Sequence, residues 1–104
     1  MRCLEQIRND VCYHDLDVKI LCSGPGLSYG SLGFTHHTLE DIAIMRSLPN
    51  IEIFSPSTES ETMRSLDELL RTASPGFCRL DKSFVHIDGS TDHVEIQDQS
   101  LIHI

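Results

Sequence analysis

The sequence predicts an α/β fold, a three-layer α/β/α arrangement with a parallel sheet in the middle. Two observations favour this class: short apolar runs alternate with longer amphipathic runs, and turns rich in glycine, proline or asparagine separate them. The strand-like runs cover residues 18–22, 51–54 and 76–80, and the helix-like runs cover residues 3–12, 39–46 and 59–70. Such an alternation forms βαβ units with right-handed crossovers. Three strands make an incomplete doubly wound sheet, so we expect a fragment of a larger domain.

The first helix-like run places Cys3, Leu4, Ile7 and Val11 on one face, with polar residues between them. No capping residue precedes this run, so we expect that chain upstream of it is missing. The strand-like run at 18–22 is almost wholly apolar. That composition is typical of a strand buried on both faces of a parallel sheet.

The second helix-like run carries a start signal. Thr38 stands three residues before Asp41, which predicts a cap in which the hydroxyl holds a backbone amide and the carboxylate reaches back. A helix that begins in this way is expected to turn Leu39, Ile42 and Ala43 toward the core.

The third helix-like run begins with a capping box, Thr58 and Glu61. Its apolar stripe consists of Met63, Leu66, Leu69 and Leu70. Beyond Ser83 the alternation fades into polar turns. We therefore expect a partial domain over residues 1–83 and a linker over residues 84–104 toward a missing C-terminal domain.

The composition excludes several classes of function. Sixteen Asp and Glu oppose eight Lys and Arg among 104 residues, which argues against nucleic-acid or anionic-membrane partners. No apolar run approaches the length of a membrane span, and the N-terminus lacks the apolar core of a signal peptide. The four cysteines form no C-x-x-C pair, so we expect free thiols, no metal site and a cytoplasmic location.

The loop at 23–37 is the candidate functional segment. It holds four glycines and one proline, which let the backbone turn tightly, and it ends in His36 and His37. Ligands of open α/β sheets collect at the carboxyl ends of strands, where this loop begins. The structural alternative, a long turn with two hydrogen-bonded histidines, carries equal weight on spacing alone.

Three segments resemble the thiamine-diphosphate enzymes of the transketolase family, in their pyrimidine-binding domain. They are residues 30–50, with Gly-Phe-Thr-His-His followed by Glu-Asp-Ile, residues 55–58, and residues 75–82. The resemblance covers residues 2–83. Its central segment is long and ordered, which makes it more specific than a lone glycine-rich loop.

The resemblance implies a transferase that moves a two-carbon ketol unit between sugars or sugar phosphates. His36 matches a family histidine near the reacting carbons, and a histidine suits proton exchange with sugar hydroxyls because its pKa lies near neutrality. His37 stands where the family often has glutamine and is a candidate for a second, substrate-binding contact. Lys82 matches a basic residue that reaches substrate phosphate in the family, and the alternative reading, a solvated charge near a strand end, stays open. Leu32 and Gly24 stand where many transketolases have an acidic residue and a phosphate-binding histidine, so the substrate is expected to differ or to be held by other groups.

Arg79, inside an apolar strand, admits a functional reading and a structural one, as an arginine with a paired counter-charge.

The resemblance also implies thiamine diphosphate and Mg²⁺, held between this domain and a diphosphate-binding domain or subunit in a homo-oligomer or two-subunit enzyme. The family's catalytic glutamate lies upstream of residues 3–12, and no Gly-Asp-Gly…Asn segment for magnesium diphosphate is present. We therefore expect both groups to be held mainly by segments absent from this chain, which by itself should be inactive. The alternatives are a 1-deoxyxylulose-5-phosphate synthase-like enzyme, a 2-oxo-acid dehydrogenase β-subunit-like enzyme and a non-catalytic assembly subunit.

Overall fold

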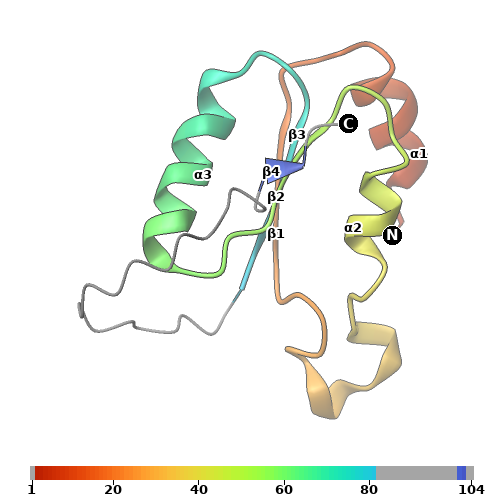
Figure 1. The fold of residues 1–104 in the computed structure, drawn as a ribbon. Helices are drawn as coiled ribbons and strands as arrows, with labels where there is room; N and C mark the ends of the chain where they lie inside the picture. The colour runs from red at the N-terminus through yellow and green to blue at the C-terminus, as the bar shows by residue number, and fades with distance from the viewer. Residues whose placement is uncertain (1, 82–100, 103–104) are drawn as a thin grey trace.

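The computed structural model describes residues 2–81 and 101–102 of the chain (Figure 1). Its helices and strands are α1 (Leu4–Gln6), which continues as a wider helical turn η1 (Ile7–Cys12), β1 (Lys19–Ser23), α2 (Asp41–Met45), β2 (Glu52–Phe54), α3 (Glu59–Arg71), β3 (Gly76–Leu80) and β4 (Leu101–Ile102). Two short 3-10 turns, η2 (Gly30–Leu32) and η3 (Phe34–His36), lie between β1 and α2.

The sheet has the order β1-β3-β2-β4. β3 is paired on both sides in parallel: Leu21 of β1 lies opposite Cys78, and Ile53 of β2 lies opposite Phe77. The short β4 pairs with β2 in the antiparallel direction. Figure 1 shows α3 on one face of the sheet and α1 and α2 on the other. The predicted three-layer α/β/α fold with a parallel sheet is therefore confirmed.

Each face of the sheet carries its own core cluster, because successive residues of a strand point to opposite faces. Ile53 and Phe77 face α1 and α2, whereas their neighbours Phe54 and Cys78 face α3. The cluster on the first face also contains Ile7, Cys12, Met45, Leu48 and Ile51, and the cluster on the second face contains Leu69.

The prediction that the first strand is buried on both faces is wrong for β1. Ile20 and Cys22 pack against the core, but the side chain of Leu21 is 54% exposed. In the part of the chain that the structure describes, β1 pairs with β3 alone, and α3 packs against β3. The face of β1 that carries Leu21 therefore lies beyond the cover of α3.

The predicted cap of α2 by Thr38 and Asp41 is also wrong. Glu40 occupies the cap position and its side chain makes no capping hydrogen bond. Thr38 is used by its backbone instead, in a pair of hydrogen bonds with Gly26. The carboxylate of Asp41 points to Arg79, so it does not reach back along the chain.

The later start of α2 changes which side chains it buries. The buried positions are Asp41 and Met45 in α2 and Leu48 in the turn just beyond it, which continue the four- and three-residue spacing of one helix face. Ile42 packs at the edge of the core as expected, but Leu39 and Ala43 are exposed.

The capping box of α3 is confirmed: the Thr58 hydroxyl accepts from the amide of Glu61, and the Glu61 carboxylate accepts from the amide of Thr58. The predicted apolar stripe is only partly buried. Leu66 and Leu69 pack against the sheet, whereas Met63 and Leu70 are exposed. These two lie about 100–120° around the helix from Leu69, at 100° per residue, and so miss the sheet.

The predicted boundary at residue 83 and the linker at 84–104 fall almost entirely outside the described residues and stay predictions. Within the described ranges, no helix combines the length and the apolar character that crossing a membrane requires.

Candidate functional site

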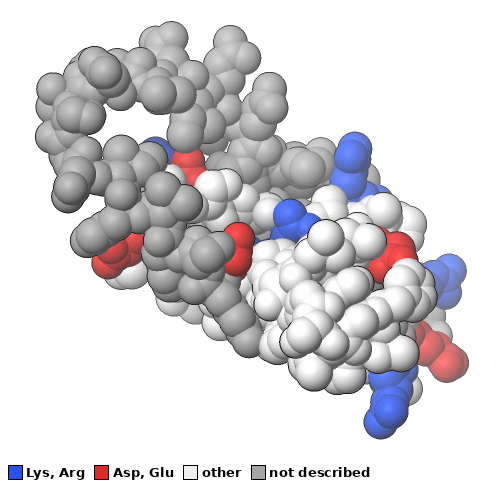
Figure 2. All heavy atoms as spheres, turned by 90° about the horizontal axis from the view of Figure 1, so that it is seen from below, with Lys and Arg blue, Asp and Glu red and all other residues white. Residues whose placement is uncertain are grey.

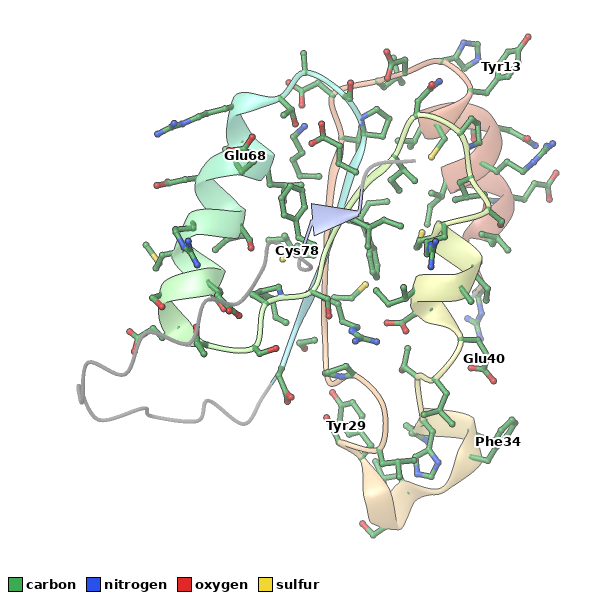
Figure 3. The ribbon with its side chains drawn as sticks, in the orientation of Figure 1. Tyr13, Tyr29, Phe34, Glu40, Glu68 and Cys78 are labelled. Carbon is green, nitrogen blue, oxygen red and sulfur yellow. The ribbon has the colours of Figure 1, made fainter. Side chains whose placement is uncertain are left out.

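The glycine-rich loop lies at the carboxyl edge of the sheet. β1, β2 and β3 run in parallel and therefore end at the same edge, at Ser23, Phe54 and Leu80. The amide of Gly24 donates to the carbonyl of Leu80 at 3.2 Å, which fastens the start of the loop to β3. Figure 3 shows the loop projecting beyond this edge before the chain enters α2. The position agrees with the edge at which ligands of open α/β sheets bind.

Two backbone hydrogen bonds close the loop at its base. Gly26 N donates to Thr38 O at 2.8 Å, and Thr38 N donates to Gly26 O at 2.9 Å. Gly26 and Gly33 have φ values of 58° and 78°, a region that glycine adopts without steric cost. The closed base and these turns fold the segment between them into the two 3-10 turns, η2 and η3.

His36 ends η3 and is exposed, as a side chain that meets a ligand must be. The Thr35 hydroxyl lies 3.0 Å from Nδ1 of the His36 ring, within hydrogen-bond distance. The Tyr29 ring lies nearby, with its centroid 6.4 Å from the imidazole centroid and its plane tilted by 58°. Phe34 extends outward from the loop and is 78% exposed (Figure 3).

His37 has a different partner. Its Nε2 lies 3.3 Å from the carbonyl oxygen of Gly30, across the loop. Because a carbonyl only accepts, this contact requires the proton on Nε2 of His37. The structure thus places both predicted histidines on one loop with different hydrogen-bond partners. The third predicted residue, Lys82, lies outside the described residues.

The two departures from the family pattern have visible structural settings. Gly24 has a φ of 82°, and a Cβ at this position would collide with the Tyr29 ring. A histidine at this position would therefore require Tyr29 to move. Leu32 lies in η2 with its side chain largely exposed. Neither position offers a polar side-chain contact to a substrate.

Charged residues avoid the loop. Residues 23–38 contain no Asp, Glu, Lys or Arg, although the chain has a formal net charge of −8. Figure 2 looks onto this end of the molecule and shows a broad uncharged area with charged side chains at its margins. The exposed apolar side chains of the segment are Leu27, Leu32 and Phe34, with Leu39 directly after it. This surface suits contact with another protein surface or with an uncharged ligand better than contact with a charged one.

Arg79 joins three elements next to the loop. Its Nη1 donates to Oδ1 of Asp41 at 3.2 Å, and its Nε and Nη2 donate to the Ser55 hydroxyl at 3.2 and 3.0 Å. The Asp41 side chain is 4% exposed and that of Arg79 is 26% exposed. The structure therefore supports the structural reading of Arg79, as the link between β3, the end of β2 and α2.

The roles of Asp41 and Ser55 in this link were not predicted from the sequence. The available signal was Arg79 itself: a charged residue within an apolar strand needs a buried counter-charge. The local sequence pattern places Asp41 in a helix cap, and it therefore gives no indication that Asp41 is the partner of Arg79.

The buried cysteines offer no reactive nucleophile. Burial raises the pKa of the Cys78 thiol to about 11, with a smaller contribution from nearby Cys22. The pKa of Cys22 is raised by burial and further by the charge of Asp41 and by Cys3. Burial also raises the pKa of Cys12. All four thiols are free in the structure.

The described residues do not fit a magnesium-diphosphate site. Among residues 2–81, no group of three or more His, Cys, Asp or Glu side chains could hold a metal ion. Asp41, the buried acidic residue at the start of α2, is already paired with Arg79.

Comparisons with known proteins agree with this fold and loop. The model of the family "Transketolase, pyrimidine binding domain" matches residues 1–86. One of the subunits of apulose-4-phosphate transketolase from Actinobacillus succinogenes is 41% identical over 80 residues, which cover 77% of this chain and 26% of that protein. A 1-deoxy-D-xylulose-5-phosphate synthase of Pelotomaculum thermopropionicum is 35% identical over 94 residues, covering 80% of this chain and 14% of that protein.

A solved structure described as a split-gene transketolase, an inactive β4 tetramer, matches with a TM-score of 0.68 and 35% identity, over 81% of this chain and 26% of that one. The fold and the site define the class of protein: a three-layer α/β/α domain with a parallel sheet and a histidine-bearing loop at the carboxyl edge of that sheet. The chain belongs to the transketolase family, in its pyrimidine-binding domain. It spans about a quarter of the length of the transketolase relatives it matches. The family implies dependence on thiamine diphosphate.

Proposed function

We propose that this chain forms part of a thiamine-diphosphate-dependent transketolase that transfers a two-carbon ketol unit between sugars or sugar phosphates. The observation that carries the proposal is the loop at 23–38: it is uncharged, fixed at its base to the carboxyl edge of the sheet, and it exposes His36. The similarity to a subunit of a known transketolase over 77% of the chain supports the same activity.

In this proposal His36 is the catalytic residue that touches the substrate. With Nδ1 next to the Thr35 hydroxyl, its Nε2 is available to hydrogen-bond a sugar hydroxyl or exchange a proton with it. His37 retains Nδ1 for a second, substrate-binding contact, because its Nε2 donates to Gly30. Lys82 is proposed to bind substrate phosphate, in keeping with its match to the family's basic residue.

The proposal assigns most of the cofactor site to other segments. Thiamine diphosphate, when bound, supplies the carbanion chemistry that side chains cannot provide. The cofactor and Mg²⁺ are proposed to be held mainly by a diphosphate-binding domain or subunit, since the described residues offer no metal ligand group. The chain's own contribution is to expose His36 to the substrate on a surface that carries no Asp, Glu, Lys or Arg.

A partner is part of the proposal. The exposed Leu27, Phe34 and Leu39 form an apolar surface beside the histidines, which would be covered if another domain or subunit docked at this edge. The relatives include a single subunit of a larger transketolase and a split-gene tetramer, which supports a multi-subunit enzyme. We further propose a cytoplasmic location, where the four free thiols would stay reduced.

Two alternatives have specific support. The match to a 1-deoxy-D-xylulose-5-phosphate synthase favours a related synthase of the same cofactor class. The matched split-gene tetramer is described as inactive, which favours a chain that only assembles. Assaying the assembled enzyme with ketose donors and aldehyde acceptors separates ketol transfer from both alternatives.

The decisive variant is His36→Ala in the assembled enzyme. We expect kcat to fall by about 10- to 10⁴-fold, the range for a positioned acid–base group, with an unchanged melting temperature. His37→Ala is the matched control, and it should act more on KM than on kcat. Normal turnover by the His36→Ala enzyme would refute the assigned role.

A further inference from the structure

The Thr35 hydroxyl lies within hydrogen-bond distance of the imidazole ring of His36, the proposed catalytic residue. It lies 3.0 Å from Nδ1 of His36, and both side chains are exposed on the same 3-10 turn. We propose that Thr35 is a positioning residue, which holds His36 by Nδ1 so that Nε2 is the nitrogen that meets the substrate. The proposal deepens the proposed function and rests on it.

The backbone fixes the point from which the imidazole extends. The amide of His36 donates to the carbonyl of Gly33 at 3.0 Å, and the amide of His37 donates to the carbonyl of Phe34 at 3.2 Å. The two hydrogen bonds between Gly26 and Thr38 close the loop just beyond this turn. With the backbone held in this way, the remaining freedom of His36 is rotation of its side chain.

Two neighbours limit that rotation. The Thr35 hydroxyl engages the ring at Nδ1, and the tilted ring of Tyr29 lies 6.4 Å away between centroids. A ring flip would exchange the positions of its nitrogen and carbon atoms and break the contact at Nδ1. The hydrogen bond therefore selects one ring orientation.

A hydroxyl is well suited to a histidine that both takes and gives protons. It can donate to Nδ1 when the proton of the neutral ring is on Nε2, and it can accept from Nδ1–H when the ring is protonated. A carbonyl can only accept, which is how Gly30 holds Nε2 of His37. Of the two histidines, only His36 has a partner that tolerates both neutral tautomers of the ring, so its Nε2 can either carry or accept a proton, whereas the Gly30 carbonyl requires a proton on Nε2 of His37.

This contrast assigns different tasks to two adjacent histidines. His37 is held in one tautomer across the loop, whereas His36 keeps Nε2 open through a change of protonation. Proton exchange at a sugar hydroxyl requires the behaviour of His36. The side chain of Thr35 makes that behaviour possible without touching the substrate.

The test combines ring spectroscopy with kinetics. Thr35→Val keeps the side-chain shape and removes the hydroxyl, and Thr35→Ser restores the hydroxyl. Thr38→Val is the matched control, because the Thr38 hydroxyl makes no hydrogen bond among the described residues. The ring nitrogens of ¹⁵N-histidine-labelled full chain are measured for each variant by NMR, and kcat and KM are measured for the assembled enzyme.

We expect Thr35→Val to shift the His36 Nδ1 resonance and to lower kcat by about 3- to 10-fold, the equivalent of one lost hydrogen bond, with little change in KM. Thr35→Ser should restore both values, and Thr38→Val should change neither. Unchanged His36 resonances in Thr35→Val, or equal shifts in Thr38→Val, would overturn the inference. A normal His36→Ala enzyme would instead overturn the proposed function, so the two failures are distinguishable.

Discussion

Helices α2 and α3 start from the same local sequence pattern but by different interactions. Both follow a threonine with an acidic residue three positions later, Thr38 with Asp41 and Thr58 with Glu61. In α3 the Thr58 hydroxyl accepts from the Glu61 amide at 3.2 Å, and the Glu61 carboxylate accepts from the amide of Ser57 at 2.8 Å. In α2 the acidic residue leaves its own helix and pairs with Arg79 on β3.

The difference shows that a capping pattern is realised only where the tertiary structure leaves its residues free. Thr38 is tied by its backbone to Gly26, so it closes the loop and does not cap the helix. The start of α3 is thus fixed by contacts close in sequence. The start of α2, directly after the histidine loop, is fixed by a residue 38 positions away.

The largest expected effect comes from breaking the distant contact. Asp41→Ala should lower the free energy of unfolding by about 2–4 kcal/mol, because removing one partner of a buried ion pair leaves the other uncompensated. The 26% exposure of Arg79 places the value at the lower part of the usual range. Chemical denaturation measures it.

Glu40→Ala is the matched control, since Glu40 carries the same charge one position earlier and makes no capping hydrogen bond. It should change the free energy of unfolding by less than about 0.5 kcal/mol, as exposed substitutions do. Equal effects of the two variants on the free energy of unfolding would mean that net charge, and not the Asp41–Arg79 pair, determines the stability of α2 against the sheet.

The second prediction concerns the face of the sheet that α3 covers. Burial raises the pKa of the Cys78 thiol to about 11 in the folded chain, whereas the ordinary pKa of a thiol, which applies in the unfolded chain, is 9.0. A pKa raised on folding favours the folded state at low pH, so the free energy of unfolding should fall by up to about 2 kcal/mol between pH 9 and 11.

Cys78→Ala should reduce this dependence, even if the smaller side chain lowers stability at every pH, and Cys12 and Cys22, whose pKa values are also raised by burial, should account for a remaining slope. Cys3→Ala, at an exposed position, should change the slope far less, because Cys3 makes only the last-ranked contribution to the raised pKa of Cys22. Denaturation curves collected from about pH 8 to 11 provide the measurement. A slope that Cys78→Ala leaves intact would assign the titration to other groups.

The smallest expected effect separates the two threonines. Thr58→Ala should lower the free energy of unfolding by about 1 kcal/mol, because an N-cap hydrogen bond is lost. Thr38→Ala should cost less than about 0.5 kcal/mol, since its hydroxyl caps nothing. If the two variants were equally destabilised in denaturant titrations, the contrast between the helix starts would be invalid.

Much of the fold could be predicted because its signals are local. The alternation of strand-like and helix-like runs indicated the parallel α/β/α class, and the capping box at Thr58 located the start of α3. The burial of individual side chains was predicted less well. Leu21, Met63 and Leu70 look like core residues in sequence but are exposed, because burial depends on which neighbours cover each face.

The candidate site was located by the same kind of signal. Glycines before a histidine pair, after an apolar strand, marked the loop, and the family resemblance made His36 the functional candidate. The sequence could not show that Thr35 engages Nδ1 of His36 or that His37 is held by Gly30. Those contacts depend on backbone dihedral angles and side-chain rotation.

The order of elements, the position of the histidines between a strand and a helix, and the membership of the family all follow from the amino-acid sequence alone. They rest on hydrophobic periodicity and on residue types at fixed spacing, which act over a few turns of chain. The partner of Asp41, the role of Arg79 and the distinct hydrogen bonds of His36 and His37 became known from the folded chain. A buried charge must find its counter-charge wherever folding places one, and here that partner lies 38 residues away across the sheet edge.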